Sequence, residues 1–292
     1  MIKQILLTVA ASVLLLSSPV SAEYTFWYDD DDRKYVLSSL DIGNLVLQGL
    51  FAVIFLVLTI LAFMVKSRFP SQKSAYVISS ISSMLFFLYN AVSIPFVIFV
   101  RRQSVDVDML YKIGLATVFF RLWGIGTLYL AGSLVLHDRA KHFDECLKKG
   151  GNIAYAILFT FSGILILIGS LTSILLAIDR QGISAVLTWI VFLAIWGATA
   201  VCQFVIAAVN LRKVRNAGKD DKILSIMMKA WSPLAILSML LGVVFSFFPI
   251  TLVSDLIQNI IFSVLAAILV HLGMNSKYWD YSGVNVLPSE RA

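Results

Sequence analysis

Arg121 is the residue whose charge and position most clearly demand a chemical partner. It lies within residues 111–139, YKIGLATVFFRLWGIGTLYLAGSLVLHDR, a stretch that is otherwise largely apolar. A guanidinium in the middle of a membrane-spanning helix costs about 2.5–3.5 kcal/mol even on the most lenient insertion scale. We therefore expect an acceptor to face Arg121, either a carboxylate of this chain or an anionic or polar ligand.

The best partner in the sequence is a polar face near the start of the last apolar run. Asp255, Gln258 and Asn259 share that face, and Asn90 lies on an inward stripe of the second run. At about 1.5 Å per helical residue, Arg121 and the Asp255/Asn259 pair lie at comparable depths from the outer ends. Together with Arg121, these residues predict a polar, ligand-binding site in the outer half. An ion pair that fixes helix register and binds nothing is the alternative.

Composition places the chain in a bilayer. Of its 292 residues, 59% are hydrophobic and 14% are charged, and the mean hydropathy is +0.89. A soluble globular protein of this length carries many more charges. The formal net charge is +6, but the basic residues lie between apolar runs and form no single patch, so nucleic acid is not expected as a partner.

Seven apolar runs follow the first forty residues, and each is near the roughly 20 residues that a bilayer requires. They cover about residues 43–65, 75–100, 111–136, 152–178, 183–210, 223–248 and 252–274. We predict an all-α, polytopic membrane protein with a seven-transmembrane helix bundle at residues 43–274.

The remaining segments predict the topology. Residues 1–22 have the basic start, apolar run and small residues of a secretory signal peptide, which would form an extra helix if uncleaved. Residues 23–42 form a short acidic extracellular segment, and residues 275–292 form a cytosolic tail. With residue 23 outside, the inner loops and tail hold fourteen Lys and Arg against six in the outer segments. This bias predicts an outer N-terminus, a cytosolic C-terminus and a place in the secretory pathway, at the plasma membrane.

Small and polar residues at helical spacing predict the inward faces of the bundle. Such stripes are Gly114, Thr117, Arg121, Gly124 and Gly132 in the third run, Trp189, Trp196, Gln203 and Asn210 in the fifth, Ser79, Ser83, Asn90 and Ser93 in the second, and Ser162, Gly163, Gly169, Ser170 and Ser173 in the fourth. Trp231 follows Lys229 closely, so we expect it in the aromatic belt at the membrane interface.

Two short motifs resemble those of the rhodopsin-type receptors. Asp138-Arg139 closes the third run, where that family has an acidic-Arg pair, and Trp231-Ser232-Pro233 is similar to its Trp-x-Pro. The resemblance implies that Asp138 and Arg139 face a cytosolic signalling partner. The last run lacks the family's Asn-Pro motif and a lysine for retinal. Uncharacterised seven-helix proteins, such as those abundant in fungi, are similar to this layout as well.

Catalysis is not expected, because the sequence gathers no set of catalytic or metal-ligating side chains at one depth. Of the three histidines, His137 and His142 are loop residues beside lysines, and His271 lies apart from the polar face of its helix. No metal or cofactor is predicted. We expect a receptor-like or sensor protein whose partners are the lipid bilayer, a small anionic or polar ligand and a cytosolic signalling protein. A transporter or lipid-handling protein, or a non-catalytic structural membrane protein, is the alternative.

Overall fold

The computed structural model describes residues 39–68, 73–102, 107–141, 143, 151–178, 183–247 and 251–279. Its helices are α2 (Ser39–Arg68), α3 (Lys73–Arg102), α4 (Val107–Lys141), α6 (Gly151–Ile178), α7 (Ile183–Asn216), α8 (Lys222–Ile226), the π-helix η2 (Met227–Trp231), α9 (Ser232–Phe247), α10 (Thr251–Met274) and α11 (Ser276–Trp279). No β-strand occurs in these ranges. The predicted signal peptide, most of the acidic segment and the tail beyond Trp279 lie outside the described residues.

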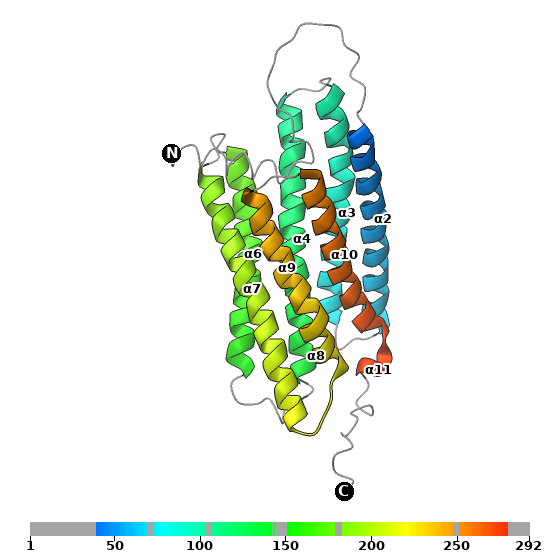
Figure 1. Ribbon diagram of the computed structural model, residues 1–292, viewed down its shortest axis with the longest axis vertical. Coiled ribbons are helices and arrows are strands. Elements are labelled where there is room, and N and C mark those ends of the chain that lie inside the picture. The colour runs from blue at the N-terminus through cyan, green and yellow to red at the C-terminus, as the bar shows by residue number, and fades with distance from the viewer. Residues whose placement is uncertain are drawn as a thin grey trace.

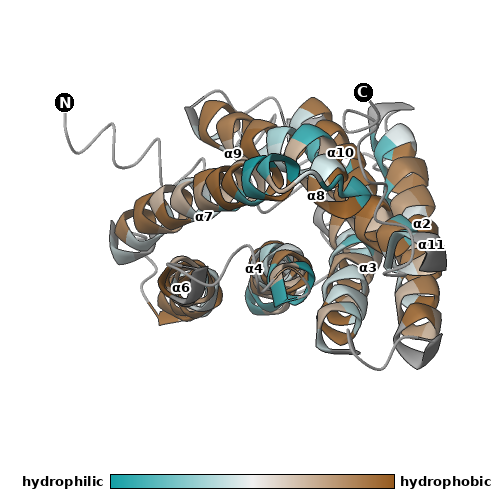
Figure 2. Cartoon of the chain, turned by 90° about the horizontal axis from the view of Figure 1, so that it is seen from below, coloured by the Kyte–Doolittle hydropathy of each residue, from teal (hydrophilic) through white to brown (hydrophobic). Residues whose placement is uncertain are grey.

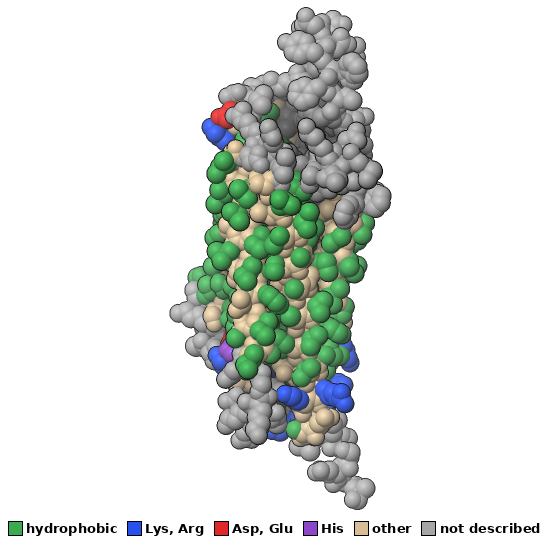
Figure 3. Space-filling view, turned by 90° about the vertical axis from the view of Figure 1, so that its left-hand side faces the viewer, with side chains coloured by type: hydrophobic (Ala, Val, Ile, Leu, Met, Phe, Trp, Pro, Cys, Tyr) green, Lys and Arg blue, Asp and Glu red, His purple; other side chains and the backbone are tan. Residues whose placement is uncertain are grey.

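Within the described residues, seven helical stretches are long and apolar enough to cross a membrane, as predicted. Each corresponds to one of the seven apolar runs, with α8, η2 and α9 together forming the sixth. The side of the molecule in Figure 3 is a broad band of hydrophobic side chains, with Lys and Arg side chains near its ends. The chain therefore has the architecture of a polytopic, all-α membrane protein.

The seven long helices lie side by side and roughly parallel to one another (Figure 1). Each packs against its neighbours in sequence, and the helices form a ring that closes where α10 packs against α2. The view along the helix axes shows α4 between α3 and α6, with α7, α9 and α10 along the opposite side (Figure 2). Because α4 also contacts α7, α8 and α10, it packs against more elements than its two neighbours in the ring.

The polar stripes expected to face inward are largely buried. The buried members are Ser79, Ser83, Asn90, Ser93, Thr117, Arg121, Ser162, Ser173, Trp189, Trp196, Gln203 and Asn210. Large apolar residues such as Val53, Ile60 and Leu167 are exposed on the outside, where they would meet lipid. Interhelical hydrogen bonds and close contacts between small residues hold such a bundle together.

A short turn joins α7 to α8 and fixes the position of Asp221. The N–H of Lys219 donates to the Val214 carbonyl at 3.1 Å, and the N–H of Gly218 donates to Arg215 at 2.9 Å. This pattern is a Schellman motif, and it requires the positive φ of +70° that Gly218 adopts. Asp221 then caps α8, accepting the N–H of Leu224 at 2.7 Å through Oδ1.

Trp231 lies in the core of the bundle, so the expectation that it sits in the interfacial aromatic belt is wrong. It is fully buried, and its indole N–H donates to Oε1 of Gln203 at 3.1 Å. The π-helical turn that ends at Trp231 precedes Pro233, which has no N–H to continue the α-helical ladder. The extra residue in this turn changes the direction of Trp231, which projects toward Gly132 on α4.

Candidate functional site

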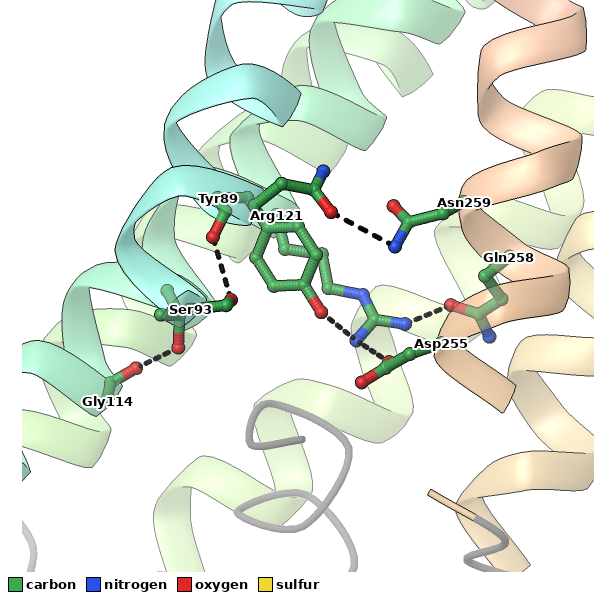
Figure 4. A network of polar contacts seen from close by, with 9 residues as sticks. Tyr89, Ser93, Gly114, Arg121, Asp255, Gln258 and Asn259 are labelled. Carbon is green, nitrogen blue, oxygen red and sulfur yellow. Dashed lines mark hydrogen bonds and ion pairs between the residues drawn. The ribbon is translucent and has the colours of Figure 1, made fainter. Parts of the chain in front are cut away.

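Arg121 meets its predicted partner inside the bundle (Figure 4). Its Nη1 lies 2.8 Å from Oδ1 of Asp255, and its Nη2 donates to Oε1 of Gln258. Nη1 also lies 3.3 Å from the hydroxyl of Tyr89. Only 7% of Arg121 and 4% of Asp255 is exposed, so the pair is almost entirely removed from solvent.

Three helices position this group. Arg121 comes from the middle of α4, while Asp255 and Gln258 are separated by three residues on α10 and therefore lie on one helical face. Tyr89 projects from α3, and the Arg121 guanidinium carbon lies 5.4 Å from the centre of its ring. The arginine thus joins α3, α4 and α10 at a single point.

The remaining two predicted site residues form a contact of their own. Nδ2 of Asn259 lies 3.3 Å from Oδ1 of Asn90, and Nδ2 of Asn90 donates to the Phe86 carbonyl at 2.7 Å. Both asparagines are buried. Figure 4 shows Asn259 beside the Arg121 group, and its bond to Asn90 means that α3 and α10 face each other with polar side chains.

The geometry defines the chemistry that this group can perform. A buried ion pair recovers its desolvation cost only with good geometry and further hydrogen bonds, which Gln258 and Tyr89 supply. The guanidinium can also bind a carboxylate or phosphate bidentately if Asp255 yields its place. The structure shows the ion pair, and ligand binding by these residues stays a prediction.

A second buried ion pair lies near the other end of α4. Nε of Arg139 donates to Oδ2 of Asp221 at 2.7 Å, and its Nη2 donates to the same oxygen. The rings of Phe143 and Trp279 lie with their centres 5.1 and 5.7 Å from the guanidinium carbon. Arg139 is only 5% exposed, so it is held by an aspartate and two aromatic rings.

Asp138, the other residue predicted to face a cytosolic partner, is arranged differently. Its Oδ1 lies 3.7 Å from the ammonium of Lys141, one turn further along α4. Its Oδ2 is buried and has no hydrogen-bond partner in the described part of the chain. Asp138 and Arg139 are therefore engaged within the molecule, and coupling to a partner remains a prediction for both.

Gln203 is at the centre of a third polar group, between the two ion pairs. Its Nε2 donates to the Tyr129 carbonyl at 2.7 Å and lies 3.0 Å from the hydroxyl of Ser133, while its Oε1 accepts from Trp231. The Tyr129 hydroxyl donates to the Ala235 carbonyl at 2.7 Å. These bonds tie α4, α7 and the π-helical part of the sixth membrane-spanning stretch together.

Several residues of these groups, among them Tyr89, Trp279 and Asp221, were not singled out from the sequence. Tyr89 and Trp279 are aromatic residues among many, and only their position in space brings them to an arginine. Asp221 lies in a charged loop, where an acid is ordinarily solvated. Asp221 directly precedes an apolar helix and lies three residues before Leu224, as an N-cap residue does. This spacing could have identified Asp221 from the sequence.

The described residues contain no group of three or more His, Cys, Asp and Glu side chains that could hold a metal ion. Comparison with protein-family models, with curated proteins and with solved structures finds no match for this chain. Any function must therefore be argued from the chain's own geometry.

Proposed function

We propose that this chain is a receptor-like or sensor membrane protein in which a small anionic or polar ligand competes with Asp255 for Arg121. The two buried ion pairs of α4 carry this proposal. One joins α4 to α10, and the other joins the far end of α4 to the start of α8. A helix that is held by one polar contact at its middle and another at its far end can transmit a change at one contact to the other as a rigid element.

The energetics of the Arg121 pair suit such a role. Two apolar side chains would often be at least as stable in its place, so the pair is a costly way to hold two helices together. A ligand that shifts the equilibrium must bind the state in which Asp255 is displaced more tightly than the closed state. An oxyanion offers this difference, because it replaces the carboxylate and keeps the guanidinium paired.

The orientation that we propose has the Arg121 end near the outer side and the Arg139 end in the cytosol. The excess of Lys and Arg in the proposed inner loops supports this orientation, as does the signal-like sequence at residues 1–22. The plasma membrane is the proposed location. A cytosolic signalling protein at the Arg139 end is the proposed partner, and no catalytic step is assigned to the chain.

The test uses a chain whose Cys146 and Cys202 are replaced by Ser and whose only thiol is Arg121→Cys. In sealed vesicles, a membrane-impermeant thiol reagent is expected to label this residue from the same side of the membrane as it labels Lys112→Cys. The reaction should also be faster than that of Leu128→Cys, whose side chain is buried two turns deeper along α4. Ala217→Cys, at the opposite end, should react only after permeabilisation. Labelling no faster than at position 128 would mean that Arg121 is a structural charge.

A companion variant retains the ion pair. Gln258→Cys removes one acceptor of Arg121 but leaves Asp255 in place, so the same comparison can be made where the arginine variant does not fold. Protection of this thiol by added phosphate or a carboxylate, but not by choline, is the expected signature of an anion at Arg121. Equal labelling with and without every anion would contradict the proposal.

A transporter is the second candidate, and the same pair of contacts favours it. Two ion pairs about five turns apart on one helix are placed where two gates would close a path alternately from either side. Flux of an anionic solute or lipid across proteoliposomes, lost in Asp255→Asn and in Asp221→Asn, would favour transport. Saturable binding of an anionic ligand that alters the Arg139–Asp221 contact, with no flux of the ligand, would favour the sensor.

A further inference from the structure

The short helix α11 folds back against the bundle directly after α10. It lies at the foot of the molecule in Figure 1, beside the end of α10. The N–H of Tyr278 donates to the Asn275 carbonyl at 3.0 Å, and the indole N–H of Trp279 donates to the Leu272 carbonyl at 2.8 Å. Trp279 is only 5% exposed, so α11 is anchored by a buried aromatic side chain.

Two consecutive aromatic residues of α11 each cover a cation from a different element. The ring centre of Trp279 lies 5.7 Å from the guanidinium carbon of Arg139 on α4. The ring centre of Tyr278 lies 5.7 Å from the ammonium of Lys222, the first residue of α8. Asp221 stands between these cations, because it binds Arg139 and directly precedes Lys222. One turn of helix thus connects α10 to Arg139 and to Lys222, the residue next to Asp221.

These contacts are of a kind that can open and close. A helix of one turn has no stability of its own, so α11 keeps its shape only while it is docked. Each cation–π contact is modest at an exposed site and stronger where the cation is desolvated, as Arg139 is. In addition, Nη1 of Arg139 is buried and has no hydrogen-bond partner in the described residues, so the guanidinium retains a donor for an incoming acceptor.

We propose that α11 is a releasable clamp, and that its release uncovers Arg139 beside the already exposed Lys222. The two cations then form a surface that fits an acidic segment of a cytosolic protein. Asp221 neutralises only one of the two cations, so the uncovered surface carries a net positive charge that complements carboxylates. The inference rests on the proposed function in one respect, that the Arg139 end faces a cytosolic partner. The clamp itself requires no outer ligand.

Thiol reactivity in detergent tests the clamp. Phe143→Cys, in the chain with Cys146→Ser and Cys202→Ser, places a buried thiol beside the covered guanidinium. Removing a covering ring by Trp279→Ala is expected to raise its rate of reaction with a charged maleimide by roughly tenfold. Tyr278→Ala should raise the rate as well. The matched control Tyr278→Phe keeps the ring and should react like the parent. Equal rates in the parent and in both alanine variants would overturn the clamp.

Lys222→Gln covers the case in which Trp279→Ala does not fold. It removes one cation and leaves the rings of Tyr278 and Trp279. Like Trp279→Ala, it is therefore expected to raise the rate at which the Phe143→Cys thiol reacts with the maleimide. An unchanged rate in this variant would show that the contact does not hold α11 in place.

Binding of a fluorescent polyglutamate peptide tests the partner. We expect Trp279→Ala to bind the peptide roughly tenfold more tightly than the parent at low salt, and Lys222→Gln combined with Trp279→Ala to lose that gain. Equal affinity in the parent and Trp279→Ala would overturn the acidic partner. Neither measurement involves the Arg121 site, so failure of the clamp and failure of ligand sensing can be distinguished.

Discussion

Arg121 and Arg139 project from the same face of α4, about five turns apart. Each binds an aspartate that another helix supplies, Asp255 from α10 and Asp221 from the start of α8. At about 1.5 Å per residue the two arginines are separated by about 27 Å along the helix, which is close to the thickness of the bilayer's hydrocarbon core. One face of one helix therefore carries the main polar contacts near both ends of the bundle.

Asp255→Asn should destabilise the protein strongly. The substitution leaves the buried Arg121 without its counter-charge, and breaking a buried pair in this way costs about 3–5 kcal/mol. The midpoint of thermal unfolding in detergent measures the effect.

The control for Asp255→Asn is Asp108→Asn. Asp108 pairs with Lys112 at the surface, where both side chains are more than half exposed, and such a pair contributes less than about 1 kcal/mol. Equal melting of the Asp255 variant and the parent would show that Arg121 does not depend on this carboxylate.

Asp221 has two separable roles. Asp221→Asn removes the negative charge that holds Arg139 but keeps a side chain that caps helices well, whereas Asp221→Ala removes both. We expect both variants to be less stable than the parent, and the alanine variant to be lower by a further ~1 kcal/mol. Equilibrium unfolding of the two variants side by side measures the difference. If Asn and Ala were equivalent, the cap on Leu224 would contribute nothing.

Gly132→Ala should be destabilising because of Trp231. A Cβ at position 132 would lie 2.7 Å from Cζ2 of the indole, so the ring or α4 must move. Overpacking of this kind costs about 1–3 kcal/mol.

Gly163→Ala is the matched control for Gly132→Ala, because its Cβ would meet nothing within 4 Å. Since Ala favours a helix over Gly, this variant should be neutral or more stable by up to ~1 kcal/mol. Similar losses at both positions would contradict the close packing of Trp231 on α4.

The Gln203 and Trp231 side chains should be energetically coupled. Gln203→Leu leaves the buried indole N–H without an acceptor, which costs about 1–3 kcal/mol, and Trp231→Phe removes that N–H while keeping most of the ring. With both substitutions present, the loss should be smaller than the sum of the two single losses. A double-mutant cycle by thermal or chemical unfolding measures the coupling, and strict additivity would contradict the bond.

The sequence allowed the seven helices and the Arg121–Asp255 contact to be predicted for a simple physical reason. Hydrocarbon tolerates few charges, so a lone arginine and a lone aspartate at similar depth have few other partners. The same reasoning places Gln258, Asn259 and Asn90 on inward faces, where the structure has them buried. Tyr89 could not be predicted in this way, because in the sequence it is one of many apolar-run aromatics. Only the structure shows that its hydroxyl lies next to Arg121.

The failure at Trp231 has a different cause. The prediction used only the closeness of Trp231 to Lys229 along the chain, and Trp231 ends the π-helical turn Met227–Trp231. Closeness to Lys229 in the sequence indicated the interface, but depth along the axis does not say which way a side chain faces. Lys229 is exposed and Trp231 fully buried, although only Ala230 separates them.

The distance in sequence between Arg121 and Asp255 also bears on how the protein is made. The two residues are 134 positions apart, and the aspartate belongs to the last membrane-spanning helix. At a synthesis rate of about 5–20 residues per second, Asp255 is added to the chain roughly 7–27 seconds after Arg121. Until then Arg121 lacks the carboxylate that pairs with it in the folded bundle, so the contact that joins α4 to α10 forms only after α10 has been synthesised.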